Sequence, residues 1–190
     1  MENVKAIIFD AYGTLFDVNS AAEKCKDKIG DKWEKFSNYW RITQLEYTWL
    51  RSLMGRHKDF WEITEDSLEK SMENFNINHS MKDELLDLYK SLSTFEEVPD
   101  TLKVLKEKNY KLAILSNGTP HLLNGLVRNN KLENLFDDLF SIEEVGIYKP
   151  DSRVYGMPIK KYNIKVNEVA FLSANTWDVS GGGNYGYNAI

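Results

Sequence analysis

The feature that most constrains the fold is a short apolar run, Ala6-Ile7-Ile8-Phe9, that ends in Asp10. The run is bounded by polar residues and is too short for a helix, which predicts a buried parallel strand. Asp10 then lies at the carboxyl end of this strand, where open α/β sheets bind their ligands. A carboxylate at that place can attack as a nucleophile or hold a metal, and the alternative is an ordinary aspartate that ends a strand.

Two further apolar runs end in polar residues in the same way. The run 111–115 leads into Ser116, Asn117 and Gly118, and the run 169–172 leads into a polar segment that contains Ser173, Asn175, Trp177 and Asp178. Each polar segment has a second interpretation, because Ser, Thr and Asn also cap helices. Ser116 or Asn117 would cap a helix near Pro120, and Asn175 or Thr176 would cap a later one.

The segment between the first two predicted strands has a different character. Residues 19–94 have few glycines and no alternating β-branched runs, which predicts helices inserted as a cap, with 1–18 and 95–190 as the core domain. Arg41 and Leu45 are i, i+4 neighbours on one helix face, so both side chains can project into a cleft. The alternative is a plain amphipathic helix with Arg41 in solvent.

Composition limits the class of protein. The chain has 190 residues, 42% of them hydrophobic, and a net charge of −5, which fits one core domain with an insertion and excludes the basic patch expected for nucleic-acid binding. No apolar run is long enough to span a bilayer, and no signal peptide precedes the first strand. Cys25 is the only cysteine, so no intrachain disulfide can form. We therefore expect a cytoplasmic protein without nucleic-acid or membrane partners.

The segment 10–17, Asp-Ala-Tyr-Gly-Thr-Leu-Phe-Asp, resembles the first motif of the haloacid dehalogenase superfamily, in its 2-haloacid dehalogenase branch. Most of that superfamily are Mg-dependent phosphohydrolases with a second Asp, a general acid, two residues after the nucleophile. Tyr12 stands at that position here, and a phenol with a pKa of about 10 is a poor proton donor at neutral pH. Tyr12 instead offers an aromatic wall for an apolar substrate. The resemblance therefore favours a leaving group that needs no proton, such as halide.

The resemblance extends through four ordered motifs and the predicted cap. It implies that Asp10 is the nucleophile, that Ser116 binds the substrate anion and that Lys149, from a Gly-x-Tyr-Lys-Pro-Asp segment, neutralises the crowded carboxylates. Asp178 would activate water. The remaining matched positions comprise halide ligands, pocket-lining residues and positioning groups: Arg41, Asn117, Tyr12, Leu45, Phe60, Trp177, Thr14, Ser173, Asn175 and Tyr155. A solvated surface lysine is the alternative for Lys149.

The resemblance also implies a doubly wound, Rossmann-like parallel α/β core with a helical cap, paired as a homodimer. The expected reaction is hydrolysis of L-2-haloalkanoic acids to 2-hydroxy acids through an Asp10 ester, with no metal or other cofactor. Two alternatives remain. One is a Mg-dependent small-molecule phosphatase on the same fold. The other is an inactive remnant, because family members usually continue through a further strand and helix whereas this chain stops at Ile190.

Overall fold

A computed structural model describes residues 3–190, and the chain divides into two compact units. The first comprises the segment up to Phe16 together with Thr94–Ile190, and the second is Asp17–Ser93. The role of the second unit as a cap stays a prediction. None of the helices in residues 3–190 is both long enough and apolar enough to cross a membrane.

The first unit is built on a five-stranded parallel sheet in the order β3-β2-β1-β4-β5. The strands are β1 (Ala6–Phe9), β2 (Lys111–Ser116), β3 (Asp138–Ser141), β4 (Val169–Leu172) and β5 (Asn188–Ala189). From β1 the chain continues to β2 and then to β3 at one edge of the sheet. It then crosses to the other side of β1, where it forms β4 and β5. This reversal confirms the predicted doubly wound sheet and brings the carboxyl ends of β1, β2 and β4 to one edge.

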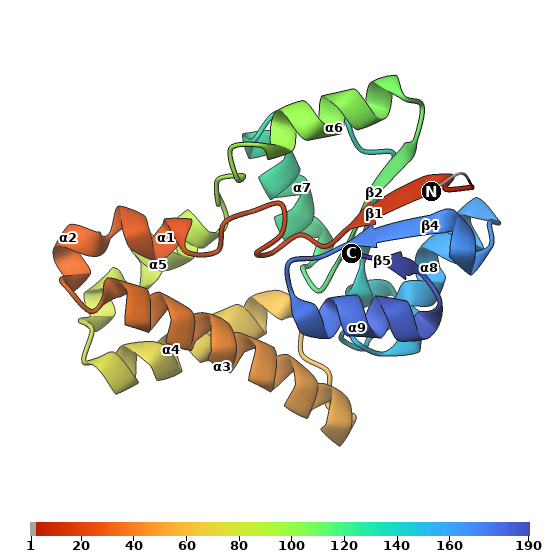
Figure 1. Ribbon diagram of the computed structural model, residues 1–190. Coiled ribbons are helices and arrows are strands. Elements are labelled where there is room, and N and C mark those ends of the chain that lie inside the picture. The colour runs from red at the N-terminus through yellow and green to blue at the C-terminus, as the bar shows by residue number, and fades with distance from the viewer. Residues whose placement is uncertain (1–2) are drawn as a thin grey trace. The chain divides into compact units, whose positions relative to one another are not determined.

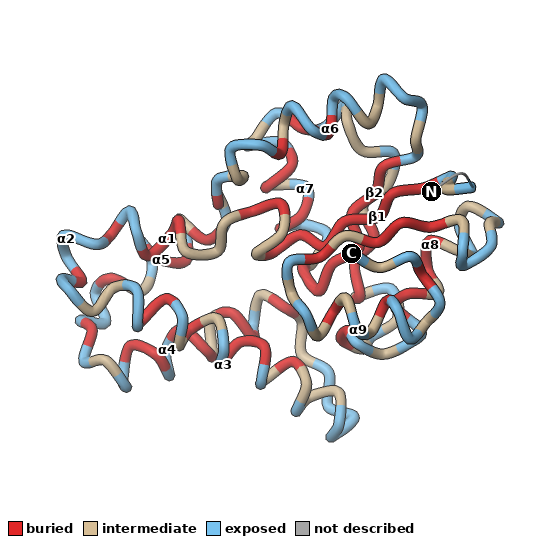
Figure 2. Tube along the Cα trace, viewed as in Figure 1, coloured by how far each residue is buried: buried red, intermediate tan, exposed pale blue. Residues whose placement is uncertain are grey.

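The core lies around the central strand. All four residues of β1 are buried, and Ile8 lies in register with Ala113 of β2 and Phe171 of β4. Figure 2 shows the three central strands as buried tubes. Continuous burial on both faces explains why these strands are unbroken apolar runs in the sequence.

Helices cover both faces of the sheet (Figure 1). The helices α6 (Val98–Glu107) and α7 (Pro120–Asn129) lie on one face, and α8 (Ser152–Tyr162) and α9 (Thr176–Tyr185) lie on the other. Short 3-10 turns, η2 (Ile142–Glu144) and η3 (Val166–Glu168), complete the connections. The helix α9 approaches β4 closely because Gly182 has no side chain: a Cβ atom there would lie 2.7 Å from the Phe171 ring.

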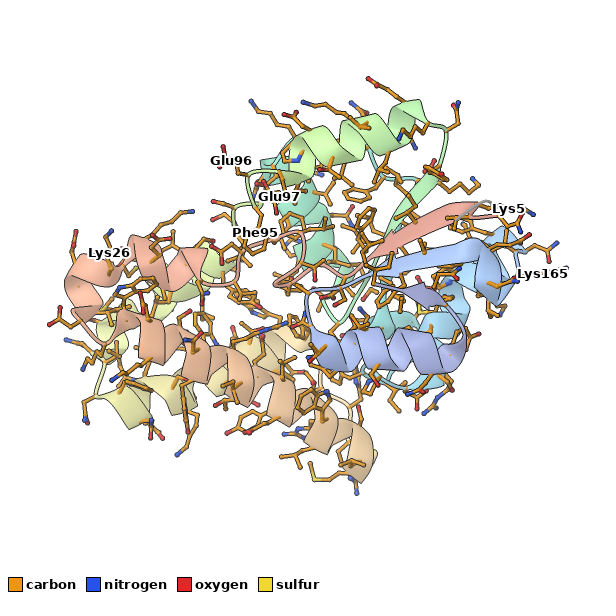
Figure 3. All side chains as sticks on the ribbon, in the orientation of Figure 1. Lys5, Lys26, Phe95, Glu96, Glu97 and Lys165 are labelled. Atoms are coloured by element: carbon orange, nitrogen blue, oxygen red, sulfur yellow. The ribbon has the colours of Figure 1, made fainter. Side chains whose placement is uncertain are left out.

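The amino ends of the strands carry solvent-exposed charge. Lys5 precedes β1 and Lys165 precedes η3, and both labelled side chains lie at this end of the sheet in Figure 3. Lys5 forms an ion pair of 2.9 Å with Glu168, with 61% of the lysine side chain exposed. Exposed pairs of this kind contribute little to stability.

The second unit is helical, as its composition predicts. It comprises α1 (Ser20–Lys24), α2 (Lys26–Ile29), α3 (Trp33–Met54), α4 (Phe60–Phe75), η1 (His79–Met81) and α5 (Lys82–Tyr89). Buried Phe36, Trp40 and Thr48 recur at helical spacing along α3, which ends at Gly55 in the left-handed conformation. An Asp59–Glu62 capping box starts α4.

Candidate active site

The Asp10 carboxylate is the centre of the site. Asp10 follows β1 and is only 5% exposed. Its Oδ2 atom accepts hydrogen bonds from Thr14 Oγ1 at 3.0 Å, Ser173 Oγ at 3.3 Å and Asn175 Nδ2 at 2.7 Å. Lys149 Nζ donates to the other oxygen, Oδ1, at 3.1 Å. The two carboxylate oxygens therefore differ: Oδ2 is surrounded by neutral donors, and Oδ1 faces a cation.

Backbone N–H groups fix the direction of the two hydroxyl donors. Thr14 Oγ1 accepts from the backbone nitrogen of Ala174 at 3.0 Å, and Ser173 Oγ accepts from the backbone nitrogen of Asn175 at 3.2 Å. Since each hydroxyl already accepts a bond, its proton is directed at Asp10. The loop after β4 thus orients donors toward the end of β1.

Lys149 joins two carboxylates in a buried position. Its side chain is 0% exposed, and its Nζ atom lies 2.7 Å from Asp178 Oδ2 as well as 3.1 Å from Asp10 Oδ1. Burial alone would lower the pKa of Lys149, but attraction to Asp10 and Asp178 outweighs it and raises the pKa above its ordinary value. Lys149 is therefore a charged ammonium at neutral pH, and the alternative of a solvated surface lysine is wrong.

Asp178 receives its second bond from a tyrosine. It lies in the first turn of α9, is fully buried, and accepts a 2.7 Å hydrogen bond on Oδ1 from the Tyr155 hydroxyl. Burial raises the pKa of Asp178 and the nearby Asp10 adds to this, while Lys149 and the Tyr155 bond oppose it. Burial also raises the pKa of Tyr155, and Asp178 raises it further, so the phenol stays protonated as a donor.

The end of β2 contributes two side chains, Ser116 and Asn117, which are both buried. Asn117 Oδ1 accepts from the backbone nitrogen of Lys149 at 3.1 Å, and Ser116 Oγ accepts from the backbone nitrogen of Gly118 at 3.0 Å. Each oxygen thus accepts one backbone hydrogen bond, and the Asn117 amide N–H groups and the Ser116 hydroxyl proton are available to donate to other partners.

The capping interpretation of both polar segments is wrong. Thr119 caps α7 by accepting from the backbone nitrogen of Leu122. Asn175 does occupy the N-cap position of α9, but its side chain makes no capping bond and instead donates to Asp10 and to the Tyr12 carbonyl.

Tyr12 and Trp177 supply aromatic surface. Tyr12 is 2% exposed and packs on Gly118, where an added Cβ atom would lie 2.8 Å from its ring. Trp177, in the first turn of α9, is half-buried and lines a cavity of about 340 Å³ together with Pro150 and Gly181.

Arg41, Leu45 and Phe60, three of the predicted site residues, belong to the second unit. Arg41 and Leu45 lie on α3, and Phe60 begins α4. Leu45 and Phe60 are buried, whereas Arg41 is half-buried and donates to Gln44 Oε1 at 2.9 Å.

Two residues that support Tyr155 did not emerge from the sequence. An added Cβ atom at Gly181 would collide with the Tyr155 hydroxyl, and the Tyr187 hydroxyl donates to the Tyr155 carbonyl. Glycine weakens a helix relative to alanine, yet α9 continues through the three consecutive glycines 181–183. The run of three glycines was the signal available in the sequence.

No group of three or more His, Cys, Asp or Glu side chains that could hold a metal ion occurs within residues 3–190. Between Asp10 and Asp178 the positive charge comes from the Lys149 ammonium.

The family model for haloacid dehalogenase-like hydrolases matches residues 4–186, which is nearly the whole chain. The chain belongs to this family. Within it, the chain is 42% identical to (S)-2-haloacid dehalogenase 1 of Pseudomonas sp. (strain CBS-3), over 100% of this chain and 85% of that protein. The predicted resemblance to the (S)-2-haloacid dehalogenase branch is therefore confirmed.

Solved structures of dehalogenases have the same fold. A crystal structure of a dehalogenase superposes with a TM-score of 0.97 at 38% identity, covering 99% of this chain and 84% of the other. L-2-haloacid dehalogenase from Xanthobacter autotrophicus, with chloropropionic acid covalently bound, superposes with a TM-score of 0.89 at 35% identity, covering 97% and 75%.

Proposed function

We propose that this chain hydrolyses L-2-haloalkanoic acids to 2-hydroxy acids and halide, without a metal cofactor. The observation that carries the proposal is the buried Asp10 carboxylate, with three neutral donors on Oδ2 and the Lys149 ammonium between Asp10 and Asp178. The covalent chloropropionic acid adduct of the Xanthobacter autotrophicus relative supports an enzyme-bound intermediate.

In the first step, Asp10 Oδ1 attacks C2 of the substrate, the carbon–halogen bond breaks, and halide leaves with the bonding electrons. Oδ1 is the candidate nucleophile because Oδ2 already accepts three hydrogen bonds. Attack from the side opposite the halogen inverts C2 and gives an Asp10 ester. Lys149 and Ser116 hold the substrate carboxylate and orient C2.

In the second step, Asp178 removes a proton from a water molecule that attacks the carbonyl carbon of the ester. Burial raises the pKa of Asp178, which makes its carboxylate a stronger base. Negative charge then develops on Oδ2, where Thr14, Ser173 and Asn175 supply a preorganised set of donors. Collapse of this intermediate breaks the bond between the ester oxygen and the carbonyl carbon. The leaving oxygen takes back the proton that Asp178 removed from water, which releases the hydroxy acid and regenerates both carboxylates.

The other predicted residues take binding roles. Arg41 and Asn117 bind the departing halide as cation and amide donor, and Tyr155 keeps Asp178 in place. The apolar part of the substrate packs on aromatic and aliphatic side chains, for which the candidates are Tyr12, Leu45, Phe60 and Trp177. The second unit acts as the cap of the enzyme.

We also propose a cytoplasmic homodimer. The single, buried Cys25 fits a reducing compartment. Exposed apolar side chains on α3, Leu50, Leu53 and Met54, support association between copies of the chain.

Halide release from L- and D-2-chloropropionate, measured in EDTA beside an Asp10→Asn control, tests the function. Release from the L form alone, lost in Asp10→Asn, is the expected result. A folded protein that releases no chloride, or that releases it only with added Mg²⁺, would overturn the proposal.

A further inference from the structure

The second unit contains a buried amide beside a cation. Gln44 lies on α3, is 1% exposed, and accepts a hydrogen bond on Oε1 from an Arg41 guanidinium nitrogen at 2.9 Å. A buried glutamine is uncommon unless its polar atoms have partners. The hydrogen bond from Arg41 satisfies the buried amide oxygen and fixes the position of the guanidinium relative to α3.

The opposite side of the amide is anchored to two other helices. Gln44 Nε2 donates to Thr64 Oγ1 of α4 at 2.7 Å and lies 3.0 Å from the Tyr89 hydroxyl of α5. Thr64 Oγ1 in turn donates its proton to the Phe60 carbonyl at 2.7 Å, so it can only accept from Gln44. The amide must therefore present its nitrogen to Thr64, which turns Oε1 toward Arg41 at 2.9 Å, with the Tyr89 hydroxyl 3.3 Å away.

The residues that anchor the amide are themselves buried and held by further contacts. The Tyr89 ring is buried 5.2 Å from the Trp40 ring, and Trp40 Nε1 donates to the Thr64 carbonyl at 3.1 Å. Burial raises the pKa of Tyr89, although Arg41 opposes this, so the phenol remains neutral. Three helices thereby fix one amide in a single orientation.

A neutral acceptor has a particular consequence for a cation. A carboxylate partner would hold the guanidinium equally well, but it would cancel the positive charge that attracts an anion. An amide oxygen orients the long arginine side chain without adding a negative charge beside it.

We propose that Gln44 is a positioning residue that sets Arg41 for binding of the departing halide. This inference rests on the proposed function. Gln44 acts through Arg41, so its contribution disappears when Arg41 is absent.

A double-mutant cycle tests this dependence. Gln44→Leu keeps the volume and removes the acceptor, and it is expected to lower kcat for L-2-chloropropionate about tenfold, and less for the bromo substrate, whose halide leaves more easily. In an Arg41→Ala background the same change should alter kcat by less than about twofold. Equal losses in both backgrounds would overturn the inference.

Two variants separate positioning from folding. Ser71→Ala removes a buried hydrogen bond from the same unit, with Ser71 Oγ donating to the Ser67 carbonyl, and should leave kcat unchanged. Thr64→Val removes the anchor of the amide but keeps the shape, and should reproduce the kcat loss if Gln44→Leu fails to fold. A Thr64→Val protein with unchanged kcat would contradict the inference.

Chloride binding distinguishes a failure of this inference from a failure of the proposed function. If the wild-type protein releases no halide, the proposed function fails, and ³⁵Cl line broadening then tests Gln44 directly. Chloride binding that depends on Arg41 and weakens in Gln44→Leu supports the positioning role. Binding that is independent of Arg41, or unchanged in Gln44→Leu, overturns it.

Discussion

Two buried polar networks, one in each unit, are built from different chemistry. In the first unit, the network is centred on an ion-pair cluster, in which the Lys149 ammonium lies between the carboxylates of Asp10 and Asp178. In the second, Gln44 is held by the neutral groups of Thr64 and Tyr89. Charge is buried where bonds are proposed to form and break, and neutral groups suffice where a side chain has only to be oriented.

The two networks should respond differently to the loss of one member. Removing one member of a buried set of paired charges leaves another charge buried without its partner. Removing a neutral partner costs one hydrogen bond. The following variants test that difference.

Lys149→Met should have the largest effect. It leaves two buried carboxylates without their cation, and we expect the free energy of unfolding to fall by about 3–5 kcal/mol at pH 7. Urea denaturation measures this loss. The double variant Lys149→Met with Asp178→Asn should recover part of it, because one of the two unpaired charges is removed. A loss below about 1 kcal/mol in Lys149→Met would show that the charged network is no more sensitive than the neutral one.

Gly181→Ala tests the packing that supports the charged network. An added Cβ atom would collide with the Tyr155 hydroxyl and lie 2.8 Å from Pro150 Cβ, so we expect a loss of about 1–3 kcal/mol in stability. Gly183→Ala is the matched control on the same helix. Its Cβ atom would lie 3.8 Å from Ala189 Cβ, an ordinary contact, so the helix should gain about 0.5–1 kcal/mol. Thermal or urea unfolding measures the change in stability of both variants. If both variants are stabilised, or both destabilised, the expected difference between the two glycines is contradicted.

Tyr155→Phe should shift the pH dependence of kcat. The Tyr155 hydrogen bond lowers the pKa of Asp178, so its loss raises that pKa further. Since Asp178 acts in its ionised form, the acid limb of the kcat profile should move to higher pH by about one unit. Tyr185→Phe, which keeps a ring 6.0 Å from that of Tyr155, serves as control and should leave the limb in place. A limb that moves to lower pH in Tyr155→Phe would be inconsistent with the proposed role of Asp178.

Tyr89→Phe should have the smallest effect. It removes one neutral hydroxyl from Gln44 while the ring keeps its packing against Trp40, so we expect a loss of about 1 kcal/mol in the free energy of unfolding. Urea denaturation is again the measurement. A loss above about 3 kcal/mol would show that the neutral network is as sensitive to the loss of one member as the charged network, and would contradict the expected difference.

The sequence predicts the sheet and the polar residues at its edge because both are local properties. The apolar runs 6–9, 111–115 and 169–172 mark the three central strands, and Asp10 directly follows the first run. Asp178 lies further along the chain, in the helix after the third run, and was predicted from the resemblance to the family. Parallel topology alone then brings the ends of the three strands together.

Contacts between distant segments could not be predicted in this way. Gly181 and Tyr187 both contact Tyr155, which lies far from them in the sequence. Gln44 is held by Thr64 and Tyr89, which lie 20 and 45 residues further along the chain. The capping interpretation of Asn175 failed for the same reason, because its side chain bonds to Asp10, 165 residues away. Local propensity describes which bonds a side chain can make, and tertiary packing selects among them.

A single turnover in ¹⁸O-labelled water shows whether the reaction passes through an Asp10 ester. With enzyme in excess over L-2-chloropropionate, the account predicts an unlabelled hydroxy acid, since its new oxygen comes from Asp10. Mass spectrometry of the peptide that contains Asp10 should then show one ¹⁸O atom in its carboxylate. Label in the hydroxy acid after the first turnover, with none in Asp10, would mean that water displaces the halide directly and would contradict the account.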